Sequence, residues 1–202
     1  PTVSNYLDLP VLLSALRVPL SKYIFNSFFI SIISTALYIL LATMAAFVLA
    51  KSNMKGMNII FMLIQYALLF NSFTLAVPQY LIVAKSGIID TYWAYILPAL
   101  ASTMGVFLMK QYMEGSIPNV LLEAAEIDGA TGVKCFFNIT IPLLSPTIFF
   151  VMITRIIGSL QVFDLIYMVM EKSNPALEKT QSLVFLFYKY TFTNKNVGYG
   201  ST

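Results

Sequence analysis

The sequence contains no histidine and only one cysteine, Cys135, among its 202 residues. Histidine is the most common general base and transition-metal ligand, so its absence removes most catalytic and metal-binding arrangements. One cysteine cannot form an internal disulfide bond and leaves the redox compartment undecided. Charge is also scarce, at 10% of residues with a net charge of +3, and this balance does not indicate a nucleic-acid partner.

Hydrophobic residues make up 58% of the chain, and the mean hydropathy is +0.80. A soluble domain of this length cannot bury so much apolar surface, so the lipid bilayer is the expected solvent. Four long runs lack charge and approach the roughly 20 residues that a membrane-spanning helix needs. An open sheet cannot satisfy its backbone in lipid, and the alternation typical of a barrel is absent. The sequence therefore predicts an all-α membrane protein with spans at about 24–50, 57–80, 91–112 and 146–170.

Residues 113–142 form the longest internal connection, and they are too polar to cross the membrane. Ser116 and Pro118 are typical of a helix start, and Gly129 or Gly132 is expected to end that helix. A second short helix is expected over 131–141. The first helix is predicted to be amphipathic, with an apolar stripe made by Val120, Leu121, Ala124 and Ile127 and an acidic face made by Glu123, Glu126 and Asp128.

The acidic face argues against binding to anionic lipid, which favours Lys and Arg. Small residues at positions 124 and 125 allow another protein to approach closely, so the helix is suited to a partner's groove. A glycine after it permits the backbone to turn sharply.

Residues 123–142, EAAEIDGATGVKCFFNITIP, resemble the cytoplasmic signature of permease subunits of binding-protein-dependent ABC importers. That signature has EAA, three residues, G, nine residues, I, one residue and LP, and Ile141 stands where the family usually has Leu. Other segments, such as GSLQVFDLIYMVM, are similar to the carbohydrate-uptake branch, nearest its maltose-permease-like shorter subunit. The resemblance implies a polytopic helix bundle of the ABC importer permease type. Members of that subunit usually have six spans, so four are visible here and the first and last are expected to be missing.

The resemblance also implies a function for the loop. In such importers it forms a coupling helix that docks on a cytoplasmic ATPase, and the residues carried over to this role are Glu123, Ala124, Ala125, Asp128, Gly129, Ile139 and Pro142. The chain has no GxxxxGK[ST] phosphate-binding loop, so it is not expected to be an enzyme, and ATP and Mg²⁺ would be bound by the partner. The implied partners are a second permease subunit, an ATPase dimer, an extracellular or periplasmic solute-binding protein, the lipid bilayer and a carbohydrate. The implied location is a bacterial inner membrane, crossed several times.

Polar residues inside the apolar runs are candidates for the substrate pathway. Asn71, Gln161 and Asp164 have groups suited to sugar hydroxyls, although each is equally suited to hydrogen bonding between helices. Arg155 lies nine residues before Asp164, on the opposite helix face, so the two are not expected to pair. Pro78 and Pro98 are expected to kink their helices, either for packing or as hinges.

Alternatives to a sugar permease remain open from the sequence. The loop signature is shared by permeases for amino acids and ions, so a non-sugar solute is possible. A membrane scaffold that does not transport, and an intramembrane enzyme, are also conceivable, but no catalytic motif supports the enzyme. The lysines that family topology places inside are fewer than those it places outside, which conflicts with the positive-inside rule.

Overall fold

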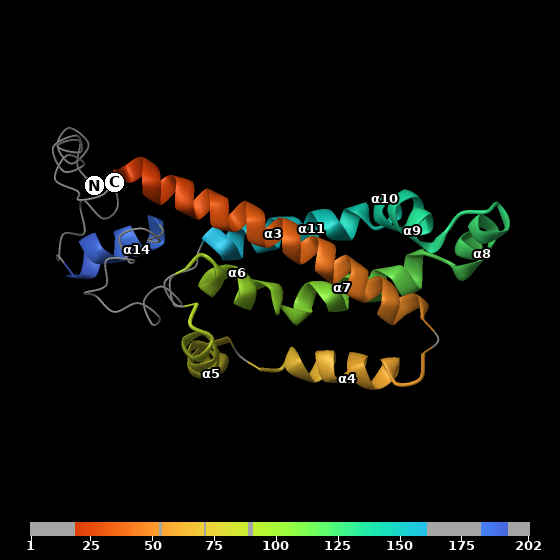
Figure 1. The fold of residues 1–202 in the computed structure, drawn as a ribbon, viewed down its shortest axis with the longest axis horizontal. Helices are drawn as coiled ribbons and strands as arrows, with labels where there is room; N and C mark the ends of the chain where they lie inside the picture. The colour runs from red at the N-terminus through yellow and green to blue at the C-terminus, as the bar shows by residue number, and fades with distance from the viewer. Residues whose placement is uncertain (1–18, 53, 71, 89–90, 161–182, 194–202) are drawn as a thin grey trace. The chain divides into compact units, whose positions relative to one another are not determined.

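The computed structural model describes residues 19–52, 54–70, 72–88, 91–160 and 183–193 (Figure 1). These residues form helices joined by short turns, without a strand among them, which confirms the predicted all-α class. The helices are α3 (Leu20–Lys51), α4 (Met57–Ala67), α5 (Ser72–Lys85), α6 (Trp93–Leu100), α7 (Thr103–Ser116), α8 (Asn119–Ile127), α9 (Gly132–Cys135), the π-helix η1 (Phe136–Thr140), α10 (Ile141–Leu143), α11 (Ser145–Leu160), α14 (Leu183–Tyr188) and the π-helix η2 (Lys189–Thr193).

Two helical segments of the described part are long and apolar enough to cross a membrane: Ser21–Lys51 in α3, and Trp93–Ser116, which combines α6 and α7. A third span is added if the pair Gly132–Leu143 and Ser145–Leu160, bent by 73°, counts as one. Four spans therefore stay a prediction. The helix expected over 24–50 is present as α3, which contains neither glycine nor proline to interrupt it.

The expectation of one continuous helix over 57–80 is wrong, because α4 ends at Ala67 and α5 begins at Ser72. After α4 the amides of Leu69 and Phe70 bond three residues back, to Tyr66 at 3.0 Å and Ala67 at 3.3 Å, which tightens and ends the helix. Pro78 lies inside α5, so it is not the residue that interrupts the segment.

The third predicted helix, over 91–112, is also divided. Its first part, α6, contains Pro98, whose missing N–H removes one backbone bond. The helix stops two residues later, and α7 starts at Thr103. Ser116 is the last residue of α7, so it does not cap the following helix as the sequence indicated. The fourth predicted helix is present as α11 up to Leu160, and its remainder to 170 lies outside the described residues.

The chain packs as two compact units, formed by residues 1–34, 76–98 and 156–202 and by residues 35–75 and 99–155. The second unit contains a buried cluster of Tyr38, Ala42, Ala46, Met109, Met113, Ile117, Leu144 and Val151. Three of these residues, Tyr38, Ala42 and Ala46, repeat every four positions on α3. Met109 and Met113 of α7 and Ile117, the residue after it, repeat in the same way, so each helix turns one face to the cluster. Lipid removes most of the hydrophobic drive between helices, so small residues such as Ala42 and Ala46 stabilise the contact by allowing close packing.

In the first unit, hydroxyl groups connect the helices. Ser159 of α11 donates to Ser31 of α3, with 3.0 Å between the two Oγ atoms. Tyr92, just before α6, donates to Oδ1 of Asn26 at 2.9 Å and packs its ring against Phe29. Such interhelical hydrogen bonds are typical of membrane helices, where an unpaired polar group has no water to bind.

Candidate functional site

The candidate site is built on α8, in the second unit. Its first turn starts at Pro118, whose carbonyl accepts from the amide of Leu121 at 3.2 Å. Helix α8 ends at Ile127, and two residues later Gly129 has φ +82°, in the left-handed region that favours glycine. The amide of Ala130 donates to the carbonyl of Ala125 at 2.9 Å. A left-handed glycine inside such a wide turn is the Schellman motif, which explains why the helix ends here.

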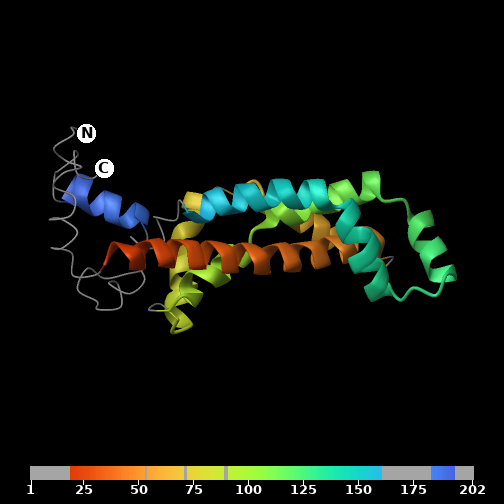
Figure 2. The ribbon, with the colours of Figure 1, turned by 90° about the horizontal axis from the view of Figure 1, so that it is seen from above.

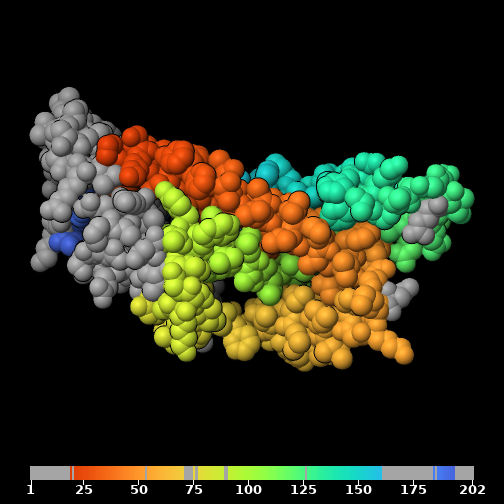
Figure 3. Space-filling model, viewed as in Figure 1, coloured from red at the N-terminus to blue at the C-terminus, as the bar shows by residue number. Residues whose placement is uncertain are grey.

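Helix α8 stands apart from the other helices of its unit. Figures 1 and 2 both show it joined to α7 and α9 by extended connections, beyond the ends of the helices that pack on one another. The space-filling view shows it at the far edge of the same unit (Figure 3). Its predicted apolar stripe is present but uncovered, since Val120 is 70% exposed, Leu121 46% and Ile127 87%.

The structure brings most of the predicted coupling residues together. Glu123, Ala124 and Asp128 are exposed on α8 and at its end, Ala125 is half-buried, and Gly129 follows directly. Ile139 and Pro142 instead lie on the segment that returns toward α11: Ile139 is half-buried in η1 and Pro142 is exposed in α10.

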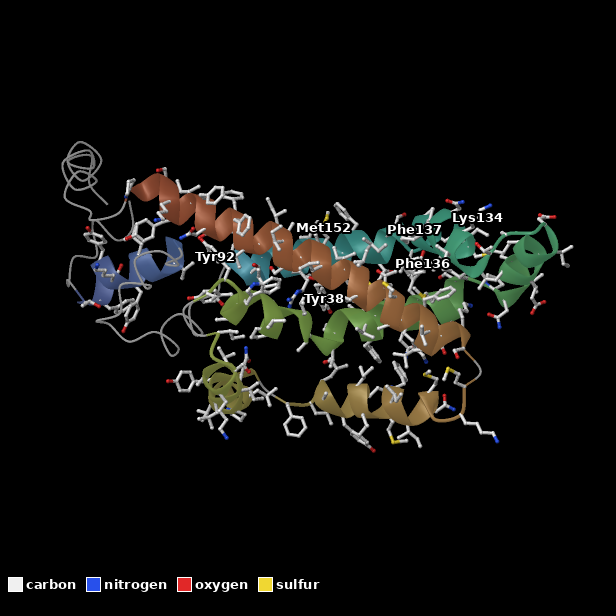
Figure 4. The ribbon with its side chains drawn as sticks, in the orientation of Figure 1. Tyr38, Tyr92, Lys134, Phe136, Phe137 and Met152 are labelled. Carbon is white, nitrogen blue, oxygen red and sulfur yellow. The ribbon has the colours of Figure 1, made fainter. Side chains whose placement is uncertain are left out.

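The return segment 132–143 is anchored to α3. Phe136, which is labelled in Figure 4, is 9% exposed. Its ring meets the ring of Phe47 edge-on, with 5.4 Å between the ring centroids. Cys135 and Thr140 are buried on the same segment. The second short helix expected over 131–141 is therefore present, but it widens to a π-helix before Pro142. Proline has no N–H to donate to the preceding turn, which favours such irregular bonding.

A residue that the sequence did not single out, Lys51, contacts the entrance of α8. Its ammonium group donates to the carbonyl of Ile117 and to Oδ1 of Asn119, the latter at 2.9 Å. The sequence showed a lysine at the end of a predicted span, which is typical of any membrane helix. The contact joins residues 66 and 68 positions apart, and helical spacing carries no signal of it.

The proposed pathway residues Asn71, Gln161 and Asp164 lie outside the described residues. Within the described ranges, no group of three or more Cys, Asp or Glu side chains gathers in a way that could hold a metal ion.

Comparison with known proteins decides the family. The family model for the binding-protein-dependent transport system inner membrane component matches residues 20–200. The chain belongs to this family. This assignment agrees with the signature at 123–142.

Several curated relatives of this chain are named as transport or import proteins for sugars or sugar derivatives. The arabinooligosaccharides transport system permease protein AraQ of Halalkalibacterium halodurans is 37% identical over 61% of this chain and 44% of its own length. The sulfoquinovosyl glycerol transport system permease protein SmoH of Agrobacterium fabrum is 34% identical over 88% of this chain and 60% of its own length. The melibiose/raffinose/stachyose import permease protein MelC of Bacillus subtilis is 34% identical over 64% of this chain and 48% of its own length. The chain thus spans about half the length of the curated relatives it matches.

Proposed function

We propose that this chain forms part of the translocation path of an ATP-driven importer for a sugar or oligosaccharide, and that α8 docks on a cytoplasmic ATPase subunit. The observation that carries the proposal is the uncovered apolar stripe of α8, at Val120, Leu121 and Ile127. This helix lies outside the segments long and apolar enough to cross a membrane. Its exposed Glu123 and Asp128 are unsuited to an anionic lipid surface, which favours a protein partner for the stripe.

The docking energy comes mainly from the stripe. Burying one Val, Leu or Ile side chain contributes about 1.5–3 kcal/mol. An exposed ion pair at Glu123 contributes about 0–1 kcal/mol, because water and salt screen it. Glu123 therefore sets the orientation and choice of partner, while the apolar side chains hold the two proteins together.

The carbohydrate substrate is supported by the names of the curated relatives, which refer to arabinooligosaccharides, sulfoquinovosyl glycerol and melibiose/raffinose/stachyose. Asn71, Gln161 and Asp164 are proposed to line the path, because amide and carboxylate groups bind sugar hydroxyls. The chain would work beside a second permease subunit, receive substrate from an extracellular or periplasmic solute-binding protein, and cross a bacterial inner membrane several times. ATP and Mg²⁺ would bind to the partner ATPase dimer.

The proposal is tested by placing a charge on the stripe. The protein is co-expressed with the ATPase subunit of its host and purified, and bound ATPase and sugar uptake are measured for the Ile127→Asp variant. We expect at least about tenfold weaker ATPase binding, since 1.4 kcal/mol corresponds to a factor of ten. Met54→Asp is the matched control, because Met54 is 64% exposed in the connection between α3 and α4 and outside the docking helix. Full ATPase binding and uptake by Ile127→Asp would show that α8 is not the docking element.

A further inference from the structure

Lys51 is the last residue of α3, and it binds both sides of the bend between α7 and α8. Its ammonium group donates to the carbonyl of Ile117, just after α7, and to Oδ1 of Asn119, the first residue of α8. All three residues belong to the same compact unit. Hydrogen bonds from a charged donor are shorter and stronger than those between neutral groups. The two bonds from Lys51 therefore hold the bend more strongly than neutral hydrogen bonds would.

The bend itself is short and stiff. Only Ile117 and Pro118 separate α7 from α8, and the proline ring fixes one of the backbone angles. The side chain of Ile117 is fully buried in the cluster that α3 and α7 share. A lysine that holds Ile117 and Asn119 together therefore fixes the first turn of α8 to the end of α3.

Lys110, a second lysine of the same unit, contacts different helices. Lys110 pairs with Glu114 within α7, with 2.7 Å between the charged atoms, and lies 3.7 Å from the ring centroid of Phe61 on α4. Lys110 thus joins α4 to α7, whereas Lys51 joins α3 to α8.

We propose that Lys51 is a positioning residue that ties α8 to α3, so that a displacement of α8 moves α3 directly. Helix α3 has 32 residues, ends at Lys51 and contains neither glycine nor proline. It therefore transmits such a displacement as a rigid element. This inference rests on the proposed function of α8, but the tie itself can be tested without the ATPase.

The first experiment measures the tie. Spin labels replace Met44 on α3 and Val120 on α8, which are both exposed, and the distance between the labels is measured in lipid nanodiscs. We expect Lys51→Met to broaden the distance distribution and shift its mean. Lys55→Met removes an equal charge from an exposed lysine of the next turn, and it is expected to leave the distribution unchanged. An unchanged distribution in Lys51→Met would overturn the proposal.

The second experiment measures coupling in the reconstituted transporter. We expect Lys51→Met to keep the ATPase bound and hydrolysing ATP. The amount of sugar taken up per ATP hydrolysed should fall about fivefold or more, since about fivefold is the lower end of typical coupling between two sites. Lys51→Arg retains donors at this position and is expected to retain most of the ratio. An unchanged ratio, or loss of ATPase binding as severe as in Ile127→Asp, would overturn the positioning role.

A milder variant tests the partner group. Asn119→Leu removes only the side-chain acceptor and leaves the carbonyl of Ile117 in place, so the ratio is expected to fall less than in Lys51→Met. The double variant should be no worse than Lys51→Met alone, because both changes break one contact. Additive effects would contradict the tie. If the labels show release of α8 while the intact protein binds no ATPase, the tie stands and the proposed function fails.

Discussion

The guanidinium group of Arg155, from α11, lies over the ring of Tyr38, from α3, at 4.4 Å from the ring centroid. Arg155 also donates to the carbonyl of Ala99, in the last turn of α6. The hydroxyl of Tyr38 donates to the carbonyl of Ser102 at 3.1 Å and accepts from the amide of Gly105 at 2.8 Å. These side chains therefore satisfy backbone groups around the break between α6 and α7, which in lipid have no water to bind.

Replacing Arg155 tests this arrangement. Arg155→Lys keeps the charge but loses the planar group that stacks on Tyr38, and Arg155→Met also loses the bond to Ala99. We expect both variants to unfold more easily, by about 1–3 kcal/mol for the uncompensated carbonyl in the methionine variant. Thermal unfolding in detergent measures the change. Lys22→Met, at an exposed lysine near the start of α3, is the control and is expected to match the unsubstituted protein. Equal stability of Arg155→Met would contradict the assignment.

Gly105 offers a steric test of the same contact. A Cβ at Gly105 would collide with the hydroxyl of Tyr38, so Gly105→Ala must displace the tyrosine. We expect a loss of about 1–3 kcal/mol, as for an overpacked core. Gly115→Ala on the same helix meets no atom within 4 Å and is expected to be neutral or slightly stabilising. In a Tyr38→Phe background, which lacks the clashing oxygen, Gly105→Ala should cost less stability than in the unsubstituted protein. An equal cost in both backgrounds would show that the clash is not the cause.

The sequence predicted the long helix α3 because charge-free residues lie between Lys22 and Lys51 without a breaker. It failed at the break between α4 and α5, since residues 68–71 contain neither glycine nor proline to signal it. Pro98 did signal a distortion, and the helix stops two residues after it. The run of apolar residues therefore locates the segment 57–80 well, but it carries no signal of the break after Ala67.

For a similar reason, only part of the candidate site could be predicted from the sequence. Spacing alone placed Glu123, Ala124 and Gly129 together, because they are close in sequence: the first two lie on α8 and Gly129 follows it. The contacts of Lys51 and of Arg155 join segments more than 50 residues apart, so they appear only in the folded chain. The sequence marked Arg155 as an intramembrane charge but could not name Tyr38 or Ala99 as its partners.

The predicted membrane sides of the loops can be tested by labelling. In a Cys135→Ser background, Ile127→Cys places a thiol on α8 at a side chain that is 87% exposed. We expect an impermeant reagent to label it only after the membrane is opened, because family topology places α8 inside. Ser86→Cys, in the exposed turn after α5, should be labelled in intact cells. Labelling of Ile127→Cys but not of Ser86→Cys in intact cells would show that the protein has the opposite orientation in the membrane. That is the orientation that the positive-inside rule predicts from the distribution of lysines.

The proposed pathway role of Asp164 predicts a specific kinetic change. Asp164→Ala and Gln161→Ala should raise the sugar concentration for half-maximal uptake by about tenfold, as expected for one lost hydrogen bond of about 1.4 kcal/mol. Assembly and basal ATP hydrolysis should be retained. Asp164→Asn, which still binds hydroxyl groups, should have a smaller effect. Failure of Asp164→Ala to assemble would identify the residue as a structural hydrogen-bond partner between helices.

The last prediction separates backbone strain from docking at the end of α8. Gly129 has φ +82°, and a Cβ there would meet no atom within 4 Å, so Gly129→Ala is disfavoured by its backbone conformation alone. That cost is about 1–2 kcal/mol, and Gly129→Asn should lessen it because asparagine tolerates the left-handed region. Gly132→Ala is the matched control, since it also has open space and carries no positive φ.

If α8 docks on an ATPase, the strain should appear as uncoupling. We expect Gly129→Ala to insert in the membrane and to lower uptake per ATP, with Gly129→Asn nearer to normal and Gly132→Ala unchanged. Glu123→Lys should weaken ATPase binding by repulsion, and Ile141→Leu, which restores the usual family residue, should be silent. Normal coupling in both Gly129→Ala and Glu123→Lys would mean that the shape and charge of this helix are not what the ATPase recognises.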